Sequence, residues 1–126
     1  MYPNDIKYSQ AHTWVKVEGA IAYIGITHYA QKQLKDIVFA NIYQDNDMVI
    51  SGESFGTLES VKSVSDVIAP VSGKIIEINS VVLDNPEKIN EDPYGVGMLL
   101  KVEISDKTQL NELMTATEYE AMIQQL

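Results

Sequence analysis

Residues 57–70 read Thr57-Leu58-Glu59-Ser60-Val61-Lys62-Ser63-Val64-Ser65-Asp66-Val67-Ile68-Ala69-Pro70. Two segments rich in β-forming residues flank a short polar stretch, which predicts strands near 56–60 and 63–68 joined by a tight turn. The single lysine of this stretch, Lys62, falls in that turn, where its amine is accessible to other proteins. An accessible amine suits covalent modification, and an ordinary solvated lysine is the alternative that the local sequence leaves open.

Lys62 is poorly placed to act as a nucleophile. A catalytic lysine needs a lowered pKa, which comes from burial or from a neighbouring cation. Glu59 lies three residues before Lys62 and Asp66 lies four residues after it. Such acidic neighbours favour the charged ammonium form instead. The sequence therefore favours Lys62 as a group that another enzyme modifies.

The composition restricts the kinds of partner. A length of 126 residues fits one domain, so we expect residues 1–126 to form a single unit. There are 18 acidic and 9 basic residues, all of the latter lysines, and the formal net charge is −9. An acidic chain without arginine is poorly suited to bind nucleic acid, since phosphate contacts supply most of that affinity. The same charge repels anionic membranes and favours a soluble monomer.

Cysteine is absent from the sequence, which excludes disulfides, thiolate zinc sites and cysteine nucleophiles. No apolar run is long enough for a transmembrane helix, and the N-terminus lacks the basic and then apolar pattern of a signal peptide. The expected location is therefore a bacterial-type cytoplasm, or an organelle interior after removal of a transit peptide.

The rest of the chain is predicted to be mainly β. Short runs of β-branched and aromatic residues alternate with turn residues, a pattern typical of a sandwich or barrel. The expected strands, besides the two around Lys62, cover 13–17, 20–26, 37–43, 48–50, 74–78 and 96–104, with a turn at 44–47.

Short helices are expected between some of these strands. Thr27 is a suitable N-cap for a helix that ends near Leu34. The expected buried side of that helix consists of Tyr29, Ala30 and Leu34. Asn85-Pro86 predicts the start of a further short helix or turn.

A C-terminal helix is predicted to begin at Glu118. Thr117 and Glu120 have the spacing of a capping box, in which each side chain bonds the backbone N–H of the other residue. The apolar residues of this segment have the spacing of an amphipathic helix: Tyr119, Met122, Ile123 and Leu126. We expect this helix to pack against the core rather than to bind a partner.

The sequence offers no recognisable active site. His12 and His28 are far apart and lack the close spacing of metal ligands. Asp45 and Asp47 alternate as in a calcium loop, but the apolar run that follows them breaks the pattern. Glycine-rich phosphate loops and paired catalytic groups are also missing. We therefore expect neither a catalytic residue nor a metal site.

Residues 56–66, together with Ala69-Pro70-Val71-Ser72-Gly73, resemble the lipoyl-lysine hairpin of glycine cleavage system H proteins. Further similar segments are His12-Thr13-Trp14-Val15, Gly25-Ile26-Thr27-His28-Tyr29-Ala30-Gln31, Asn85-Pro86-Glu87, Asn90-Glu91-Asp92-Pro93-Tyr94-Gly95 and the helix from Glu118-Tyr119. Lipoyl domains of 2-oxo acid dehydrogenases share the hairpin but not these flanks. Biotinyl domains usually carry methionines where Val61 and Ser63 stand. The resemblance is therefore specific and covers nearly the whole chain.

The resemblance implies a fold and a role. The implied fold is a mainly β, lipoyl-type barrel-sandwich hybrid of two small antiparallel sheets with short helices, including a C-terminal helix. The implied role is that of a carrier and not an enzyme, with lipoate joined by an amide bond to Nζ of Lys62. The arm would take an aminomethyl group from the pyridoxal-phosphate glycine decarboxylase to the tetrahydrofolate-dependent aminomethyltransferase. Dihydrolipoamide dehydrogenase would reoxidise it, and a lipoate ligase or a lipoyl/octanoyltransferase would attach it.

Residues around the lysine are implied as recognition marks for the modifying enzyme: Glu59, Ser60, Val61, Ser63 and Asp66. We expect Glu59 and Asp66 in particular to be exposed near Lys62.

The sequence departs from the family at three places. Thr13 stands where the family usually has a glutamate, which is linked there to holding the charged aminomethyl arm in a surface cleft. Residues 43–47 replace a turn with proline and glycine, and Met98 stands where tryptophan is usual. Thr13 matters most, because it removes a candidate charge partner. It leaves open an H-like protein that relays lipoate to other lipoyl domains. A separate alternative is an interaction domain that kept the fold, in which Lys62 would never be modified.

Overall fold

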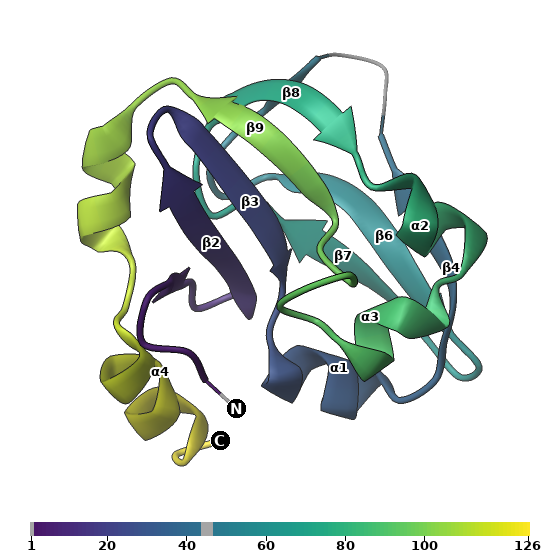
Figure 1. Ribbon diagram of the computed structural model, residues 1–126. Helices are drawn as coiled ribbons and strands as arrows, with labels where there is room; N and C mark the ends of the chain where they lie inside the picture. Colours follow the sequence, from purple (N-terminus) through teal and green to yellow (C-terminus); the bar gives the residue numbers. More distant parts are fainter. Residues whose placement is uncertain (1, 44–46) are drawn as a thin grey trace.

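The computed structural model describes residues 2–43 and 47–126, which form two antiparallel sheets with short helices around them (Figure 1). The larger sheet has the strand order β1-β2-β3-β9-β8-β5, and the smaller has the order β4-β6-β7. The strands are β1 (Lys7–Tyr8), β2 (Thr13–Glu18), β3 (Ile21–Ile26), β4 (Ile37–Ile42), β5 (Met48–Val49), β6 (Ser54–Ser60), β7 (Val64–Ile68), β8 (Gly73–Ile78) and β9 (Leu100–Ile104). The expected mainly β architecture of two antiparallel sheets is confirmed.

The helices cover the ends of the sheets. They are α1 (His28–Leu34), α2 (Ser80–Asp84), α3 (Glu87–Glu91), the 3-10 helix η1 (Lys107–Glu112) and α4 (Ala116–Ile123). α1 contacts α3, and α4 contacts β1 at the edge of the larger sheet (Figure 1). In the part of the chain that the structure describes, no helix has the length and apolar character needed to cross a bilayer.

The main core lies between the two sheets. Leu58 of β6 and Val67 of β7 are buried on the inner face of the smaller sheet. Ile24 of β3 and Val102 of β9 belong to the same buried cluster and come from the larger sheet. Since successive side chains of a strand point to opposite faces, these residues fix which side of each sheet faces the core.

A second cluster is aromatic and holds the C-terminal helix. Tyr8 and Tyr119 stack with ring centroids 4.9 Å apart, and both are fully buried together with Trp14. Burying a large apolar side chain contributes about 1.5–3 kcal/mol, so this cluster attaches α4 to the edge of the larger sheet. The expectation that the C-terminal helix packs on the core is confirmed.

The capping box of α4 lies two residues earlier than the sequence indicated. Thr115 Oγ1 accepts a hydrogen bond from Glu118 N (3.2 Å), and Glu118 Oε1 accepts one from Thr115 N (2.9 Å). The prediction of Thr117 and Glu120 was wrong because both pairs have the same spacing. Met114 is still paired with β1, and that pairing decides where the extended chain ends.

The buried side of α4 is shorter than predicted. Tyr119 is fully buried, whereas Met122 and Ile123 are only partly buried. Leu126 is 73% exposed. The prediction assumed a helix through residue 126, but α4 ends at Ile123, so Leu126 is not on its buried side.

Gln31 is the buried residue of α1, which the apolar pattern did not indicate. Its Oε1 accepts a hydrogen bond from Asn90 Nδ2 (3.1 Å), so burial costs its polar group little. Tyr29, Ala30 and Leu34 are only partly buried. The Thr27 cap is confirmed, since its side chain accepts a hydrogen bond from the backbone N–H of Ala30.

The strand predicted over 96–104 is confirmed only from Leu100 onwards. Residues 93–97 form turns instead, and Trp14 Nε1 donates a hydrogen bond to the backbone oxygen of Pro93 (3.0 Å). A Cβ at Gly97 would lie 2.5 Å from a backbone oxygen of α3, so the chain passes very close to that helix. This packing overrides the β-forming tendency of Val96.

The other predicted strands lie within two residues of their observed bounds. The turn predicted at 44–47 falls largely on Gln44, Asp45 and Asn46, which lie outside the described residues. β1, α2 and η1 were not predicted, since each is too short to show a clear hydrophobic period.

Tyr119→Phe is expected to destabilise the protein. The Tyr119 hydroxyl lies 2.7 Å from His12 Nδ1 and 2.7 Å from Thr27 Oγ1, so its removal leaves two polar groups short of a partner. A loss of about 1–3 kcal/mol in the free energy of unfolding should follow, measured by urea denaturation. Tyr23→Phe is the matched control, because the Tyr23 hydroxyl makes an exposed 3.3 Å bond to Glu18. Equal losses in the two variants would contradict the account.

Candidate functional site

Lys62 lies in the middle of the three-residue turn, Val61 to Ser63, that joins β6 to β7. The last ladder bond of the hairpin runs from Ser60 N to the carbonyl oxygen of Ser63 (2.8 Å). The buried Ser60 hydroxyl accepts hydrogen bonds from Ser63 N (3.2 Å) and Lys62 N (3.4 Å). The backbone of the turn is therefore held by Ser60, while the side chains of Val61 and Lys62 are exposed.

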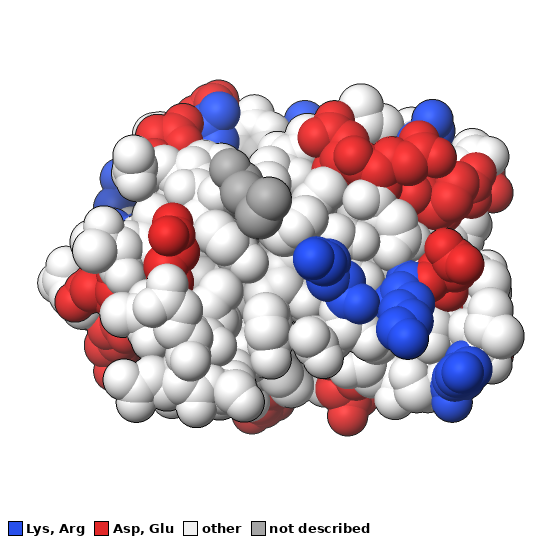
Figure 2. All heavy atoms as spheres, turned by 90° about the horizontal axis from the view of Figure 1, so that it is seen from below, with Lys and Arg blue, Asp and Glu red and all other residues white. Residues whose placement is uncertain are grey.

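The surroundings of Lys62 carry charges of both signs. A surface hollow of about 400 Å³ is lined by the turn and by the end of α1, including Lys35 and Asp36. Lys62 makes no ion pair with any residue in 2–43 or 47–126. Figure 2, a view of the molecule from below, shows lysine and acidic side chains next to each other at the right and at the upper left. The Lys62 amine is exposed and makes no ion pair among the described residues, so it is available for modification.

Glu59 and Asp66 are both exposed, and they stand at different distances from the turn. Glu59 pairs with Val64, the first residue of β7, and so lies directly beside the turn. Asp66 pairs with Thr57, farther along the hairpin, and accepts a hydrogen bond from Ser54 Oγ (3.1 Å). Of the two acids, Glu59 therefore lies nearer to the turn that carries Lys62.

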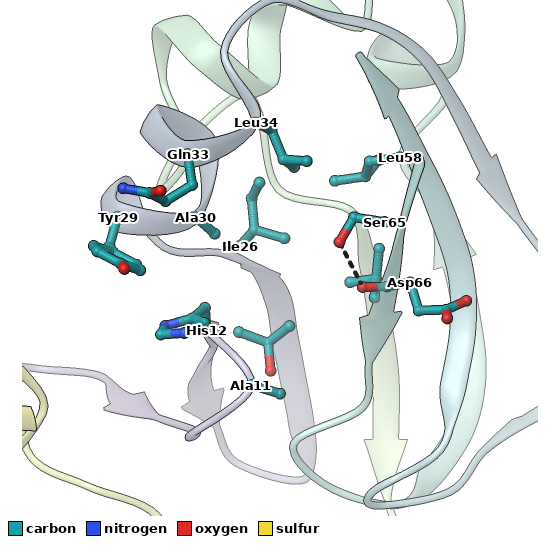
Figure 3. A pocket seen from close by; sticks show the side chains of 12 residues that line it. Ala11, His12, Ile26, Tyr29, Ala30, Gln33, Leu34, Leu58, Ser65 and Asp66 are labelled. Carbon is teal, nitrogen blue, oxygen red and sulfur yellow. Dashed lines mark hydrogen bonds between the residues drawn. The ribbon is translucent and has the colours of Figure 1, made fainter. Parts of the chain in front are cut away.

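A second pocket lies between β6, β7, α1 and the loop before β2 (Figure 3). We call it the inner pocket; its volume is about 170 Å³. Its lining consists of Ala11, His12, Thr13, Ile26, Tyr29, Ala30, Gln33, Leu34, Leu58, Ser65, Asp66 and Val67. Figure 3 shows Leu34 and Leu58 pointing toward each other across the pocket, while the Asp66 carboxylate points away from it.

The inner pocket has a neutral lining. Burial lowers the pKa of His12, so the imidazole is uncharged at neutral pH, and its Nδ1 is hydrogen-bonded to the Tyr119 hydroxyl. Thr13 is buried and its hydroxyl donates to the backbone oxygen of Ile68 (2.9 Å). Asp66 is the single acidic residue of the lining, and its carboxylate points outward (Figure 3). An uncharged chain therefore suits this pocket better than an ammonium group does.

The structure brings most of the predicted recognition residues together. Ser60, Val61, Lys62 and Ser63 form the turn, and Glu59 is adjacent to it. Ser60 is buried, so its direct contribution is to hold the turn rather than to face a partner. The inner pocket was missed by sequence reasoning, because its lining comes from four separate segments with no common motif.

The two histidines do not meet. His12 contacts Tyr119, whereas His28 Nδ1 lies 3.2 Å from the side-chain nitrogen of Gln31. Within the described ranges, no group of three or more potential ligating side chains could hold a metal ion.

Comparisons with known proteins agree on one family. The family model described as glycine cleavage H-protein matches residues 6–126. A glycine cleavage system H protein from Carboxydothermus hydrogenoformans is 50% identical over 123 residues, which are 98% of this chain and 95% of that protein. The crystal structure of a glycine cleavage system H protein from Mycobacterium marinum superposes with a TM-score of 0.86 at 40% identity, covering 95% of this chain and 97% of that one. The chain therefore belongs to the glycine cleavage H-protein family, the lipoyl carriers of the glycine cleavage system.

Proposed function

We propose that residues 1–126 form one carrier domain that holds lipoate on Nζ of Lys62 and moves an aminomethyl group between glycine decarboxylase and the tetrahydrofolate-dependent aminomethyltransferase. The observation that carries this proposal is an exposed lysine on a hydrogen-bonded hairpin turn, in a chain of this family. Dihydrolipoamide dehydrogenase and a lipoate ligase or lipoyl/octanoyltransferase complete the expected set of partners. The protein itself acts as their shared substrate and not as an enzyme.

The residues around Lys62 fit such an attachment. The amine is exposed, and no described residue pairs with its charge. Ser60 fixes the backbone on which the side chain stands. Bound lipoate would supply the disulfide chemistry of the carrier reaction, and the partner enzymes would supply the remaining catalytic groups.

A fixed turn favours transfer between several enzymes. A flexible arm on a rigid base remains at high effective concentration in whichever active site the protein docks. The base here is the end of a β-hairpin whose register is held by backbone bonds on both sides of β6. The mobility needed for transfer therefore resides in the arm and the lysine side chain.

The inner pocket is the place where the arm would rest between reactions. It adjoins the hairpin that carries Lys62, and its neutral lining includes Leu34 and Leu58. These side chains favour an uncharged arm, and no lining carboxylate faces inward to pair with a charged one.

The neutral pocket favours a second candidate role, the donation of lipoyl groups to other lipoyl domains. The observation behind it is Thr13, which is buried and bonded to Ile68. Glycine decarboxylation reconstituted with the partner enzymes separates the two roles. Efficient turnover would favour the glycine cleavage role, whereas transfer of lipoate to an acceptor domain without turnover would favour the relay.

Lys62→Ala is expected to abolish lipoylation. After co-expression with a lipoate ligase or an octanoyltransferase, the intact mass of the wild-type protein should rise by one lipoyl or octanoyl group. Lys62→Ala should show no such rise, because the accepting amine is gone. Lys35→Ala is the matched control, since Lys35 lines the same hollow, and it should be modified normally. An unmodified wild type, or modification that persists in Lys62→Ala, would refute the proposal.

Ser60→Ala is expected to slow lipoylation and to lower the free energy of unfolding by about 1 kcal/mol. The change removes the acceptor for the N–H groups of Lys62 and Ser63, so the turn becomes less well fixed. Initial rates of lipoylation and urea denaturation measure the two effects. Ser63→Ala serves as the control because the Ser63 hydroxyl bonds only Ser60 Oγ within the described chain. A wild-type rate in Ser60→Ala would show that the turn needs no such support.

Glu59→Gln is expected to lower kcat/KM for lipoylation more than Asp66→Asn does. We propose both acids as recognition marks, but Glu59 adjoins the turn while Asp66 is farther away and bonded to Ser54. The difference should shrink in high salt, because screening weakens contacts between exposed charges. Steady-state kinetics with the purified, unlipoylated proteins measure this difference. Equal kcat/KM for the wild type, Glu59→Gln and Asp66→Asn would exclude recognition of these two charges.

A further inference from the structure

The outward face of the smaller sheet carries an exposed row of side chains beside the lysine turn. Phe39, Glu59 and Val64 are direct cross-strand neighbours in β4, β6 and β7. Strand alternation places them on the face opposite to the buried Leu58. Phe39 is 53% and Val64 63% exposed, with the exposed Glu59 between them. We call these three residues the outer row.

Two exposed valines extend the outer row. Val38 lies at the register shift of β4 next to Phe39, and Val61 stands in the turn next to Lys62. Single apolar side chains are common on protein surfaces. Here four exposed apolar side chains and one exposed carboxylate occur on β4, β6, β7 and the turn beside the proposed modification site, a mixture suited to binding another protein.

The position of the outer row restricts its partner. Strands are about 4.8 Å apart, so the row is roughly 10 Å long, and Val64 stands about 7 Å along the chain from Lys62. An extended lysine side chain reaches only about 6 Å from its backbone. An enzyme that forms a bond at Nζ must therefore cover the surface next to the turn. Enzymes that act on the far end of a lipoyl arm react farther from Lys62, so they do not need to cover this surface.

We propose that the outer row is the docking surface for the enzyme that acylates Lys62, an inference that rests on the proposed function. In that reaction the neutral amine attacks the carbonyl carbon of an activated acyl donor, the amide bond forms, and the activating group and the amine proton leave. The matching enzyme surface is apolar around Phe39 and Val64. It also presents a lysine or arginine to Glu59, which makes no ion pair with any described residue.

Phe39→Ala is expected to reduce kcat/KM for lipoylation by about fivefold or more through a higher KM, as truncation of a central interface residue does. The assay uses purified apo-protein with a lipoate ligase, lipoate and ATP. Ile76→Ala is the matched control: Ile76 is 52% exposed in β8, in the other sheet, and its removal should leave the kinetics unchanged. Because Phe39 is exposed, Phe39→Ala should keep the wild-type melting temperature, and Phe39→Leu should restore much of the lost kcat/KM.

A competition assay measures docking separately from acylation, because the competing protein lacks the reacting amine. Lys62→Ala protein should inhibit lipoylation of the wild type, because it presents the outer row without an acceptor, and Phe39→Ala with Lys62→Ala should not. Wild-type lipoylation kinetics in Phe39→Ala would overturn the docking inference and leave the carrier function intact. Slower glycine decarboxylation by pre-lipoylated Phe39→Ala, with normal lipoylation, would assign the row to the decarboxylase and also overturn it. A wild type that is never acylated would overturn the carrier function itself.

Discussion

The register of the β6–β7 hairpin is the constraint on which the site depends. The hydrogen bond from Ser60 N to the Ser63 carbonyl closes the ladder, and it sets Leu58 opposite Ser65 and Glu59 opposite Val64. A slip of one residue would turn every side chain of the hairpin to the other face. The same register therefore buries Leu58 in the core, exposes Glu59 and leaves Lys62 at the tip.

The two faces of the hairpin have different chemistry. The inner face borders the neutral inner pocket, where Thr13 and His12 contribute no charge. The outer face displays Phe39, Glu59 and Val64. Under the proposed function this separation is useful, because one face would shelter the arm while the other would stay free for docking. The neutral lining would favour an uncharged arm over a charged one.

Local sequence signals were sufficient for the hairpin and for most strands. The turn at Lys62 is indicated by the β-forming segments on both sides of it. The start of α1 is indicated by Thr27, which directly precedes an amphipathic helix. The family resemblance then supplied the fold and the role. The predictions were wrong where two positions share the same local pattern and only a tertiary contact distinguishes them. Thr115 and Thr117 both offer a capping box, and the pairing of Met114 with β1 decides between them.

Other features depend on contacts between distant segments. The turns over residues 93–97 are held by local bonds to Asp92, and Trp14 adds a hydrogen bond to Pro93 from far along the chain. Gln31 can be buried because its side-chain oxygen accepts a hydrogen bond from Asn90, a residue of α3. The outer row requires the register of three strands, so Phe39 could not be connected with Lys62 from the sequence alone.

Tryptic peptide mapping of the protein from its own host cells tests the central claim most directly. Trypsin cleaves after unmodified lysines, and Lys62 is the one lysine between Lys35 and Lys74. Lipoylation of Lys62 therefore predicts an uncleaved peptide 36–74 that carries the lipoyl mass. Peptides 36–62 and 63–74 without added mass, or a lipoyl group on any other lysine, would contradict the account.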